Sequence, residues 1–341
     1  MLKVIAYTGG HNAPARVPRV QQYIPYLKRE DIEVTESPSR AGSYPPEHGF
    51  GKRMAWGLWN LAEHLSTVGQ SYQYDVTLLQ REMLSTFVTF EPFTKRPRVL
   101  DVDDAIWVHR GGGFARHLAR SCDHVICGNS FLAEGFSRWN PSVSVLPTAV
   151  DTGRFVPPDG SRRMGPPAIG WMGLSSGFCY LYQIEAALGE VLRNHPESVL
   201  RIISDKEPKF RQLPANQVEY VPYSREREVA DIQEMTVGIM PLDDSEVTRG
   251  KCSFKMIQYM SCGIPVVVSE IGMNTEVLQK GEIGFGAARL QDWVDALETL
   301  LASPQLCERM GRAGRAVSER YYSVDVLAPR LAATLRSQTE S

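Results

Sequence analysis

The stretch with the greatest potential for chemistry runs from Met240 to Val268. There an apolar segment leads through a polar loop into a helix and then into a second apolar segment. Three cations, Arg249, Lys251 and Lys255, fall in the loop and at the start of the expected helix. The free backbone N–H groups of a helix N-terminus attract anions, and nearby cations strengthen that attraction. This combination suits a diphosphate, although a solvated loop before a capped helix has the same composition.

Further polar groups accompany these cations. Helical spacing places Gln258 one turn after Lys255, so its amide can grip hydroxyls beside the expected phosphate site. The preceding strand end offers Asp243 and Asp244, and Glu276 follows the next strand. Glu276 suits contact with a sugar or a nucleotide, and equally an ordinary carboxylate at the start of a helix.

The first apolar run of the chain also ends in residues that suit ligand binding. Gly9 and Gly10 follow it, and their lack of a side chain allows a ligand to approach the backbone. Arg19 opens the next expected helix, where it can reach a phosphate or an acceptor. A tight turn and an exposed helix-terminal arginine are the plainer interpretations.

A cluster of carboxylates, Asp101, Asp103 and Asp104, ends a buried-looking strand. Clustered carboxylates raise one another's pKa unless they are separated or paired, so such a cluster is costly and suggests a function. A divalent metal is one interpretation of the cluster, and contact with a sugar or an acceptor is the other. His109 lies shortly after the cluster, either as part of the same site or as a solvated loop residue.

The elements that must position these residues alternate between β-rich apolar runs and amphipathic helices, such as the one expected over Tyr180–Asn194. The runs form two series: Lys3–Tyr7, Asp75–Leu79, Arg98–Val102, His124–Cys127 and Ser144–Leu146, then Ala168–Met172, Val199–Ile203, Val218–Val221, Val237–Met240 and Pro265–Val268. Such alternation indicates parallel sheets with crossover helices, hence an α/β protein of two doubly wound domains. Ligands of these sheets bind beyond the carboxyl ends of the strands, so we expect the site in a cleft between the domains.

Two segments are rich in Pro and Gly. Val156–Pro167 is the expected interdomain linker, and Pro38–Gly51 is expected to be a long loop. The aromatic residues Phe50, Trp56 and Trp59 near this loop suit stacking against an acceptor sugar or lipid, and equally a place in the core.

Composition excludes several classes of protein. The 341 residues are 43% hydrophobic and 22% charged, as in ordinary globular proteins. The balance of 37 Lys and Arg against 39 Asp and Glu predicts no nucleic-acid partner. Six cysteines without C-x-x-C spacing argue against a disulfide scaffold or a zinc site. No membrane-spanning window and no signal-peptide core occur, so we expect a cytoplasmic protein.

The segment Arg249-Gly250-Lys251-Cys252-Ser253-Phe254-Lys255 and the following Ile257–Val267 resemble the motif of the retaining glycosyltransferases of family 4. Four other segments resemble the same family in the same order: Arg16–Val20, Asp101–Trp107, Pro147–Thr152 and Ile169–Gly173. The resemblance covers nearly the whole chain. It implies the GT-B fold, with two facing Rossmann-like domains and an interdomain cleft.

The resemblance also implies a function. Residues 1–160 would form the acceptor-side domain, 161–322 the nucleotide-sugar-binding domain, and 323–341 a helix that packs back toward the first domain. The protein would be a hexosyl- or other glycosyltransferase that uses a nucleotide diphosphate sugar of the UDP or GDP type and retains the anomeric configuration. It would need no cofactor or metal, and the cluster of Asp101, Asp103 and Asp104 would contact the donor sugar or the acceptor rather than a metal. The acceptor would be a hydroxyl of a glycan, a lipid-linked molecule or a small molecule, in polysaccharide, cell-envelope or glycosylated-metabolite synthesis. A lipid-linked acceptor would bring the protein to the inner membrane face.

The chain departs from the family pattern at the donor site. The commonest form of the motif has two glutamates where Gly250 and Gln258 stand here, and Asp243 or Asp244 is a hypothetical replacement for the first.

Many members also have an Arg and a Lys in the loop that here reads Gly173-Leu174-Ser175-Ser176-Gly177-Phe178. Backbone N–H groups and the Ser175 and Ser176 hydroxyls would then help to bind the diphosphate, with its charge left to Lys251 and Lys255. The resemblance seats the base near Asp205, and Arg249, Ser253 and Phe254 complete the expected donor site.

Two other functions stay open. The same fold serves nucleotide-sugar epimerases, and the departures at Gly250 and Gln258 are compatible with a non-catalytic nucleotide-sugar-binding protein. A dehydrogenase is disfavoured because no G-x-G-x-x-G follows the first strand.

Overall fold

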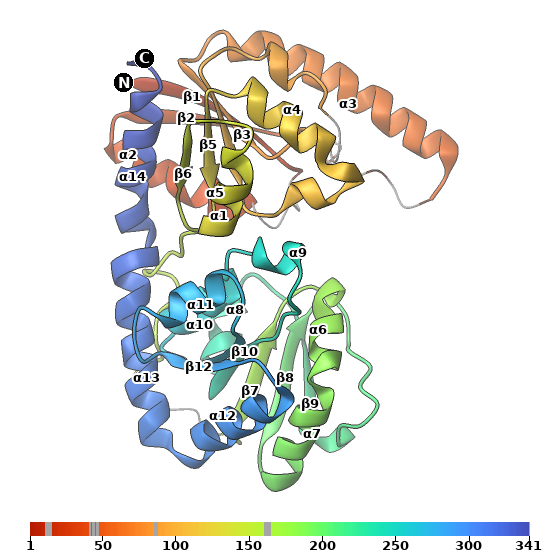
Figure 1. Ribbon diagram of the computed structural model, residues 1–341, viewed down its shortest axis with the longest axis vertical. Coiled ribbons are helices and arrows are strands. Elements are labelled where there is room, and N and C mark those ends of the chain that lie inside the picture. The colour runs from red at the N-terminus through yellow and green to blue at the C-terminus, as the bar shows by residue number, and fades with distance from the viewer. Residues whose placement is uncertain are drawn as a thin grey trace. The chain divides into compact units, whose positions relative to one another are not determined.

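The computed structural model describes residues 1–10, 16–40, 42, 45, 48–84, 88–159 and 165–340. The chain divides into two compact units, Met1–Ala149 with Arg249–Cys252 and Val324–Ser341, and Val150–Thr248 with Ser253–Ser323. Each unit is built around a six-stranded parallel sheet (Figure 1). The expected α/β fold with two Rossmann-like domains is thus confirmed. The domain boundary expected at residue 160 lies outside the described residues, as does the middle of the expected linker.

The first unit has the strand order β2-β1-β3-β4-β5-β6, so the direction in which strands are added reverses between β1 and β3. Its strands are β1 (Leu2–Thr8), β2 (Ile32–Pro38), β3 (Val76–Gln80), β4 (Arg98–Val102), β5 (His124–Cys127) and β6 (Val143–Val145). Its helices are α1 (Arg16–Arg19), α2 (Ile24–Arg29), α3 (Phe50–Ser71), α4 (Gly113–Ser121), α5 (Ser130–Ser137) and α14 (Val324–Ser337).

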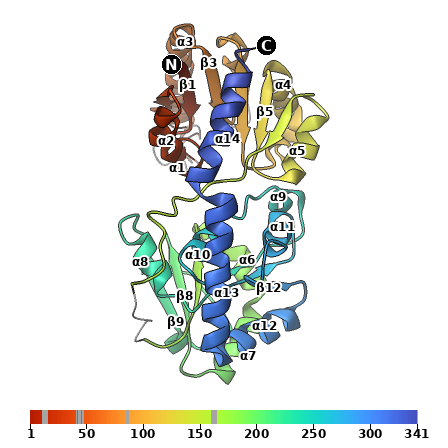
Figure 2. The same cartoon turned by 90° about the vertical axis from the view of Figure 1, so that its left-hand side faces the viewer.

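The core of the first unit lies where α2 and α14 cover the sheet (Figure 2). Val4 and Val76 from neighbouring strands meet Leu27 of α2 and Leu327 and Leu331 of α14 in one buried cluster. The apolar positions of α14 recur at helical spacing and therefore face the sheet together. The C-terminal helix is thus an integral part of the first unit.

The second unit has the strand order β12-β11-β10-β7-β8-β9, so the chain reverses its direction of winding between β7 and β10. Its strands are β7 (Ala168–Met172), β8 (Val199–Ser204), β9 (Val218–Pro222), β10 (Val237–Met240), β11 (Val266–Ser269) and β12 (Gly284–Ala287). Its helices are α6 (Phe178–Gln183), α7 (Glu185–Asn194), α8 (Glu228–Gln233), α9 (Glu246–Arg249, whose last residue groups with the first unit), α10 (Phe254–Ser261), α11 (Met273–Leu278), α12 (Leu290–Ala302) and α13 (Pro304–Val317).

Every expected strand is present, with its ends shifted by one residue at most. Two strands, β2 and β12, were not predicted from the sequence. The single helix expected over Tyr180–Asn194 is divided into α6 and α7 at Ile184, whose backbone leaves the helical region at φ −105° and ψ 10°. The stripe of Leu181, Ile184 and Leu188 is nonetheless buried in the core of the second unit, as its spacing predicted.

Candidate functional site

In the second unit, the loops that follow β7 and β10 meet at the point where the winding reverses, which is where open α/β sheets bind ligands. Ser269 at the end of β11 joins the loop after β10 to the sheet. The N–H of Leu242 donates to Ser269 Oγ at 2.9 Å, and the Ser269 hydroxyl donates back to the Leu242 carbonyl at 2.9 Å. Two hydrogen bonds therefore hold the loop after β10 against the end of β11.

Helix α10 is anchored by hydrogen bonds at two places, just before its first residue and in its second turn. The Tyr259 hydroxyl oxygen accepts a hydrogen bond of 2.8 Å from the N–H of Met172, at the end of β7. Ser253, just before the helix, has the left-handed backbone φ 49° and ψ 25°, and its hydroxyl donates to Asn274 Oδ1 at 2.7 Å. A non-glycine residue in this region is strained, and such strain persists only where surrounding contacts enforce it. The start of α10 is thus fixed relative to the strand ends.

Lys255, in the first turn of α10, reaches the loop after β7. Its Nζ lies 4.6 Å from the centroid of the Trp171 ring, a cation–π geometry. A Cβ atom on Gly173 would lie only 2.6 Å from this Nζ and 2.8 Å from the Trp171 ring. The loop Gly173–Phe178, which lacks a cation in the sequence, therefore receives one from α10. The absence of a side chain at Gly173 makes room for it.

The serines of the same loop differ in their surroundings. The N–H of Ser175 donates to Asp205 Oδ1 at 2.6 Å, and its hydroxyl donates to Asp205 Oδ2 at 2.9 Å. The backbone hydrogen bond from Ser175 holds the pKa of Asp205 below its usual value. Ser176 is exposed. The expectation that Ser175 turns its donors toward a phosphate is wrong in this structure, because Asp205 takes them.

Gln258 is 2% exposed, and its amide does not face solvent. Its Nε2 donates to Glu228 Oε1 at 3.0 Å, and the other carboxylate oxygen of Glu228 lies 2.7 Å from Arg154 Nη2. The expected grip on sugar hydroxyls is thus replaced by a chain that joins the buried amide, the buried Glu228 carboxylate and the half-buried Arg154 guanidinium. Glu228 and Arg154 were not predicted as part of the site. Nothing in the sequence around either residue indicates that Glu228 contacts both Gln258 and Arg154.

The other expected donor-site residues of the second unit lie nearer its surface. Asp243 accepts a hydrogen bond of 2.9 Å from the Ser245 hydroxyl, and Asp244 is exposed. Phe254 and Glu276 are half-buried. Burial raises the pKa of Tyr322, and the nearby Glu276 carboxylate contributes to that rise.

In the first unit, Arg19 lies 3% exposed beneath the end of β4. Its Nε donates to Asp101 Oδ2 at 3.0 Å, its Nη2 pairs with Asp101 Oδ1, and its Nη1 donates to the Leu146 carbonyl at 2.8 Å. This bidentate pair is buried on both sides. Arg19 therefore stabilises the first unit, and the expectation that it contacts a phosphate or an acceptor is corrected.

The two carboxylates that follow β4, those of Asp103 and Asp104, lie closer to solvent. Asp104 Oδ2 is 3.2 Å from Arg81 Nη1, and the exposed His109 and the half-buried Lys251 lie near enough to favour its charged form. Although 42% of the Asp104 side chain is exposed, burial of its carboxyl group and the charge of Asp103 raise its pKa to about 6. In the described part of the chain, no hydrogen-bond partner reaches the buried Oδ1 of Asp103. Nor do its His, Cys, Asp and Glu side chains form a group of three or more that could hold a metal ion.

Asp104→Asn should stabilise the protein in a pH-dependent way. A carboxyl group with a raised pKa favours folding when it is protonated, so this contribution is complete below about pH 4 and is lost as the pH rises through about 6. The neutral amide should match the parent at about pH 4 and unfold with a free energy about 1 kcal/mol higher at about pH 8, a value reduced for solvent screening. Guanidinium unfolding at the two pH values tests this. An equal difference at both values would contradict it.

The segment Arg249–Cys252 groups with the first unit. Asn129 Nδ2 donates to the carbonyls of Arg249 and Lys251 at 3.2 and 3.0 Å. A Cβ on Gly250 would lie 2.7 Å from the Cβ of Ala105, so only glycine fits there without displacement. The structure thus divides the expected donor site. Arg249, Gly250 and Lys251 belong with Asp103 and Asp104, whereas Ser253, Phe254, Lys255 and Gln258 belong with the loop after β7.

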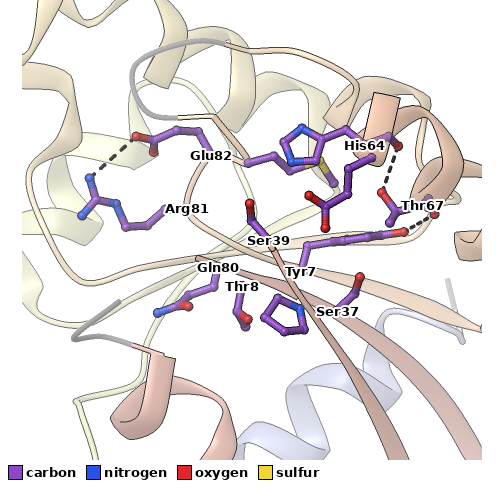
Figure 3. A pocket seen from close by; sticks show the side chains of 12 residues that line it. Tyr7, Thr8, Ser37, Ser39, His64, Thr67, Gln80, Arg81 and Glu82 are labelled. Carbon is purple, nitrogen blue, oxygen red and sulfur yellow. Dashed lines mark hydrogen bonds and ion pairs between the residues drawn. The ribbon is translucent and has the colours of Figure 1, made fainter. Parts of the chain in front are cut away.

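A shallow hollow opens to solvent at the carboxyl ends of β1, β2 and β3, beside α3 (Figure 3). It lies at the reversal point of the first sheet. Burial lowers the pKa of His64, and the His64 Nδ1 and Gln80 Oε1 atoms have no hydrogen-bond partner among the described residues. Gly9 follows β1 nearby. A Cβ on Gly10 would lie 2.8 Å from the Cα of Gly42, so a close backbone approach accounts for this glycine.

Comparison with known proteins agrees with this architecture. The model of the family described as glycosyl transferases group 1 matches residues 169–303, all of which except Arg249–Cys252 group with the second unit. A search of curated protein sequences gave no match. Together, the family match and the fold support a glycosyltransferase of the GT-B class.

Solved structures with similar folds cover nearly the whole chain. Sucrose-phosphate synthase from Thermosynechococcus elongatus has a TM-score of 0.72 and 13% identity, with 99% of both chains covered. Anabaena HepE, solved with UDP and glucose, has a TM-score of 0.69 and 13% identity, with 99% of this chain and 100% of that one covered. WaaG, a glycosyltransferase involved in lipopolysaccharide biosynthesis, has a TM-score of 0.65 and 11% identity, with 98% and 99% covered. At these identities the likeness establishes the GT-B fold.

Proposed function

We propose that this protein transfers a sugar from a nucleotide diphosphate sugar, with UDP or GDP as the nucleotide, to a hydroxyl acceptor with retention of the anomeric configuration. The observation that carries the proposal is the Lys255 ammonium held against Gly173 at the end of β7. This arrangement lies in the region that matches the glycosyl transferases group 1 model. The complex of HepE with UDP and glucose supports a nucleotide-sugar donor.

The chemistry that this site must assist is departure of the diphosphate. Negative charge accumulates on the diphosphate as the bond to the sugar breaks, so a cation already in place stabilises the transition state more than the ground state. Lys255 is oriented in advance by Trp171 and by the anchored start of α10. In our proposal, a departing phosphate oxygen accepts the proton of the attacking hydroxyl on the same face of the sugar, which accounts for retention. Metal ions and cofactors have no part in it.

We assign the acceptor to the first unit. The His64 Nδ1 and Gln80 Oε1 atoms at the hollow can accept hydrogen bonds from hydroxyl groups, as can the buried Asp103 Oδ1 at the end of β4. A glycan, a lipid-linked sugar or a hydroxylated small molecule has such groups. We place the reaction in polysaccharide, cell-envelope or glycosylated-metabolite synthesis in the cytoplasm. The role of WaaG in lipopolysaccharide biosynthesis supports the cell-envelope setting.

Thermal unfolding with UDP, GDP, ADP, TDP, CMP and NAD tests the donor site. A ligand at about 100 times its Kd stabilises a protein by about 2.7 kcal/mol, which gives a clear rise in Tm. We expect the rise with one nucleoside diphosphate, and release of that nucleotide from its sugar only when an acceptor is present. Isomerisation of the sugar without an acceptor would instead show an epimerase, and binding without turnover a non-catalytic protein.

Lys255→Ala should weaken binding of the nucleoside diphosphate by roughly tenfold to a hundredfold, since one charge-assisted hydrogen bond contributes about 1.5–3 kcal/mol. Titration calorimetry measures the change. Lys280→Ala is the matched control, because Lys280 also lies over an aromatic ring, 5.5 Å from the centroid of Tyr321. Equal affinities of the Lys255 variant and the parent would contradict the assignment of Lys255.

A further inference from the structure

Helix α3 turns an apolar stripe toward solvent. Besides Trp59, which is 59% exposed on another side of the helix, five large apolar side chains on it are between 40% and 82% exposed: Phe50, Met54, Leu58, Leu61 and Leu65. Their spacing of four, four, three and four residues places them on one side of the helix. Figure 1 shows α3 as the long orange helix that extends past the strands of the first sheet. A contiguous apolar surface of this kind marks a site of interaction.

The inner side of the same helix is polar, so the exposed stripe cannot simply rotate inward. Asn60, His64 and Ser71 are the buried residues of α3. Asn60 Nδ2 donates to the Trp56 carbonyl at 3.0 Å, and its Oδ1 accepts from the Ser39 hydroxyl at 3.2 Å. Ser71 Oγ accepts from the N–H of Lys95 at 2.9 Å. Rotation of α3 would break the hydrogen bonds to Ser39 and Lys95 and put polar groups outside, so the fold itself keeps the apolar side outward.

The charges on α3 indicate what covers the stripe. Lys52 and Arg53 are exposed in its first turn. Its one carboxylate, Glu63, is half-buried and accepts from the N–H of Arg40 at 3.0 Å. The exposed charges at the start of α3 are therefore cationic. Cations at one end of an exposed apolar helix complement anionic lipid headgroups above hydrocarbon.

We propose that α3 docks this protein on a membrane surface that contains anionic lipids, with the stripe of Phe50, Met54, Leu58, Leu61 and Leu65 in the interfacial layer. In the described residues, no helix is long and apolar enough to cross a membrane, so the contact is peripheral. Glu63, His64 and Thr67 of α3 line the hollow beside β1 and β3. Docking therefore brings the unit that contains the hollow to the lipid surface. If the proposed transfer holds, the acceptor it favours is a hydroxyl group linked to a lipid.

The experiment is co-sedimentation of the full chain with vesicles of phosphatidylcholine and phosphatidylglycerol in equal amounts, without nucleotide or sugar. The parent should bind, and should bind less to pure phosphatidylcholine. Leu58→Ser with Leu65→Ser should lower the partition coefficient roughly tenfold or more, because two exposed leucines leave the interface. Lys52→Gln with Arg53→Gln should remove the preference for phosphatidylglycerol. Leu290→Ser, at an exposed leucine of α12, is the matched control and should bind like the parent.

The thermal unfolding of each variant is compared with that of the parent, so that loss of binding is not loss of fold. Failure of the parent to bind either kind of vesicle would overturn the docking proposal, as would unchanged binding by the double leucine variant. A parent dimer that the leucine substitutions dissociate, without vesicle binding, would show that a second copy covers the stripe. These outcomes leave the donor site untouched, because nucleotide-dependent unfolding measures that site separately.

Discussion

Arg19→Met should lower the free energy of unfolding by about 3–5 kcal/mol, because it leaves the carboxylate of Asp101 buried without its partner. The guanidinium also supplies a hydrogen bond to the Leu146 carbonyl, which a methionine cannot replace. Methionine fills a volume similar to the arginine stem, so the loss reports charge and hydrogen bonding more than packing. Guanidinium unfolding followed by circular dichroism measures the change.

Two variants control this measurement. Arg138→Met removes the exposed pair with Glu134 and should change stability by less than about 0.5 kcal/mol. Arg19→Met combined with Asp101→Leu removes both buried charges and should recover part of the loss. A loss below about 1 kcal/mol in the single Arg19 variant would contradict a structural role for this pair.

Gln258→Glu should destabilise the protein by about 3 kcal/mol at about pH 8, although it restores the residue that the family motif most often has there. The new carboxylate would face Glu228 Oε1 at the distance where the amide now donates a hydrogen bond, in a buried position. Repulsion and burial would raise the pKa of the new carboxyl group. The cost should therefore shrink as the pH falls and that group takes up a proton.

The exchange of both groups tests the geometry. Gln258→Glu with Glu228→Gln restores an amide opposite a carboxylate, and should recover much of the lost stability. Denaturation of the two single variants and the double variant gives a coupling energy. Costs that simply add would show that the two side chains do not interact as the structure has them. A Gln258→Glu variant as stable as the parent would show the same.

The strands could be predicted because buried parallel strands have near-continuous apolar sequences. The two unpredicted strands, β2 and β12, are both at sheet edges. β2 has the sequence Ile-Glu-Val-Thr-Glu-Ser-Pro and is mostly half-buried, and β12 contains two glycines in four residues. Edge strands bury one side less fully, so their composition resembles that of loops. Pairing with β1 and β11 makes them strands.

The candidate site was predictable only in its residue types. The cations of residues 249–255 and the small residues after β7 suited a phosphate site in the sequence. Two contacts of the site join residues far apart in the chain. Lys255 lies over the Trp171 ring, and Gln258 donates a hydrogen bond to Glu228. The grouping of Arg249–Cys252 with the first unit is also a property of the fold. Local periodicity says nothing of such pairings.

Helix α3 shows what the sequence alone does not determine. The sequence left open whether its aromatic residues Phe50, Trp56 and Trp59 lie in the core or stack on a sugar or lipid, and in the structure Phe50 and Trp59 are exposed. The sequence determined the buried strands and the α/β class, since these depend on the pattern of apolar residues along the chain. The tertiary structure alone decided that Asn60 and His64 face inward and Leu58 and Leu65 outward. The reason is physical: which side of a helix is buried depends on hydrogen bonds to distant segments, and these exist only in the folded chain.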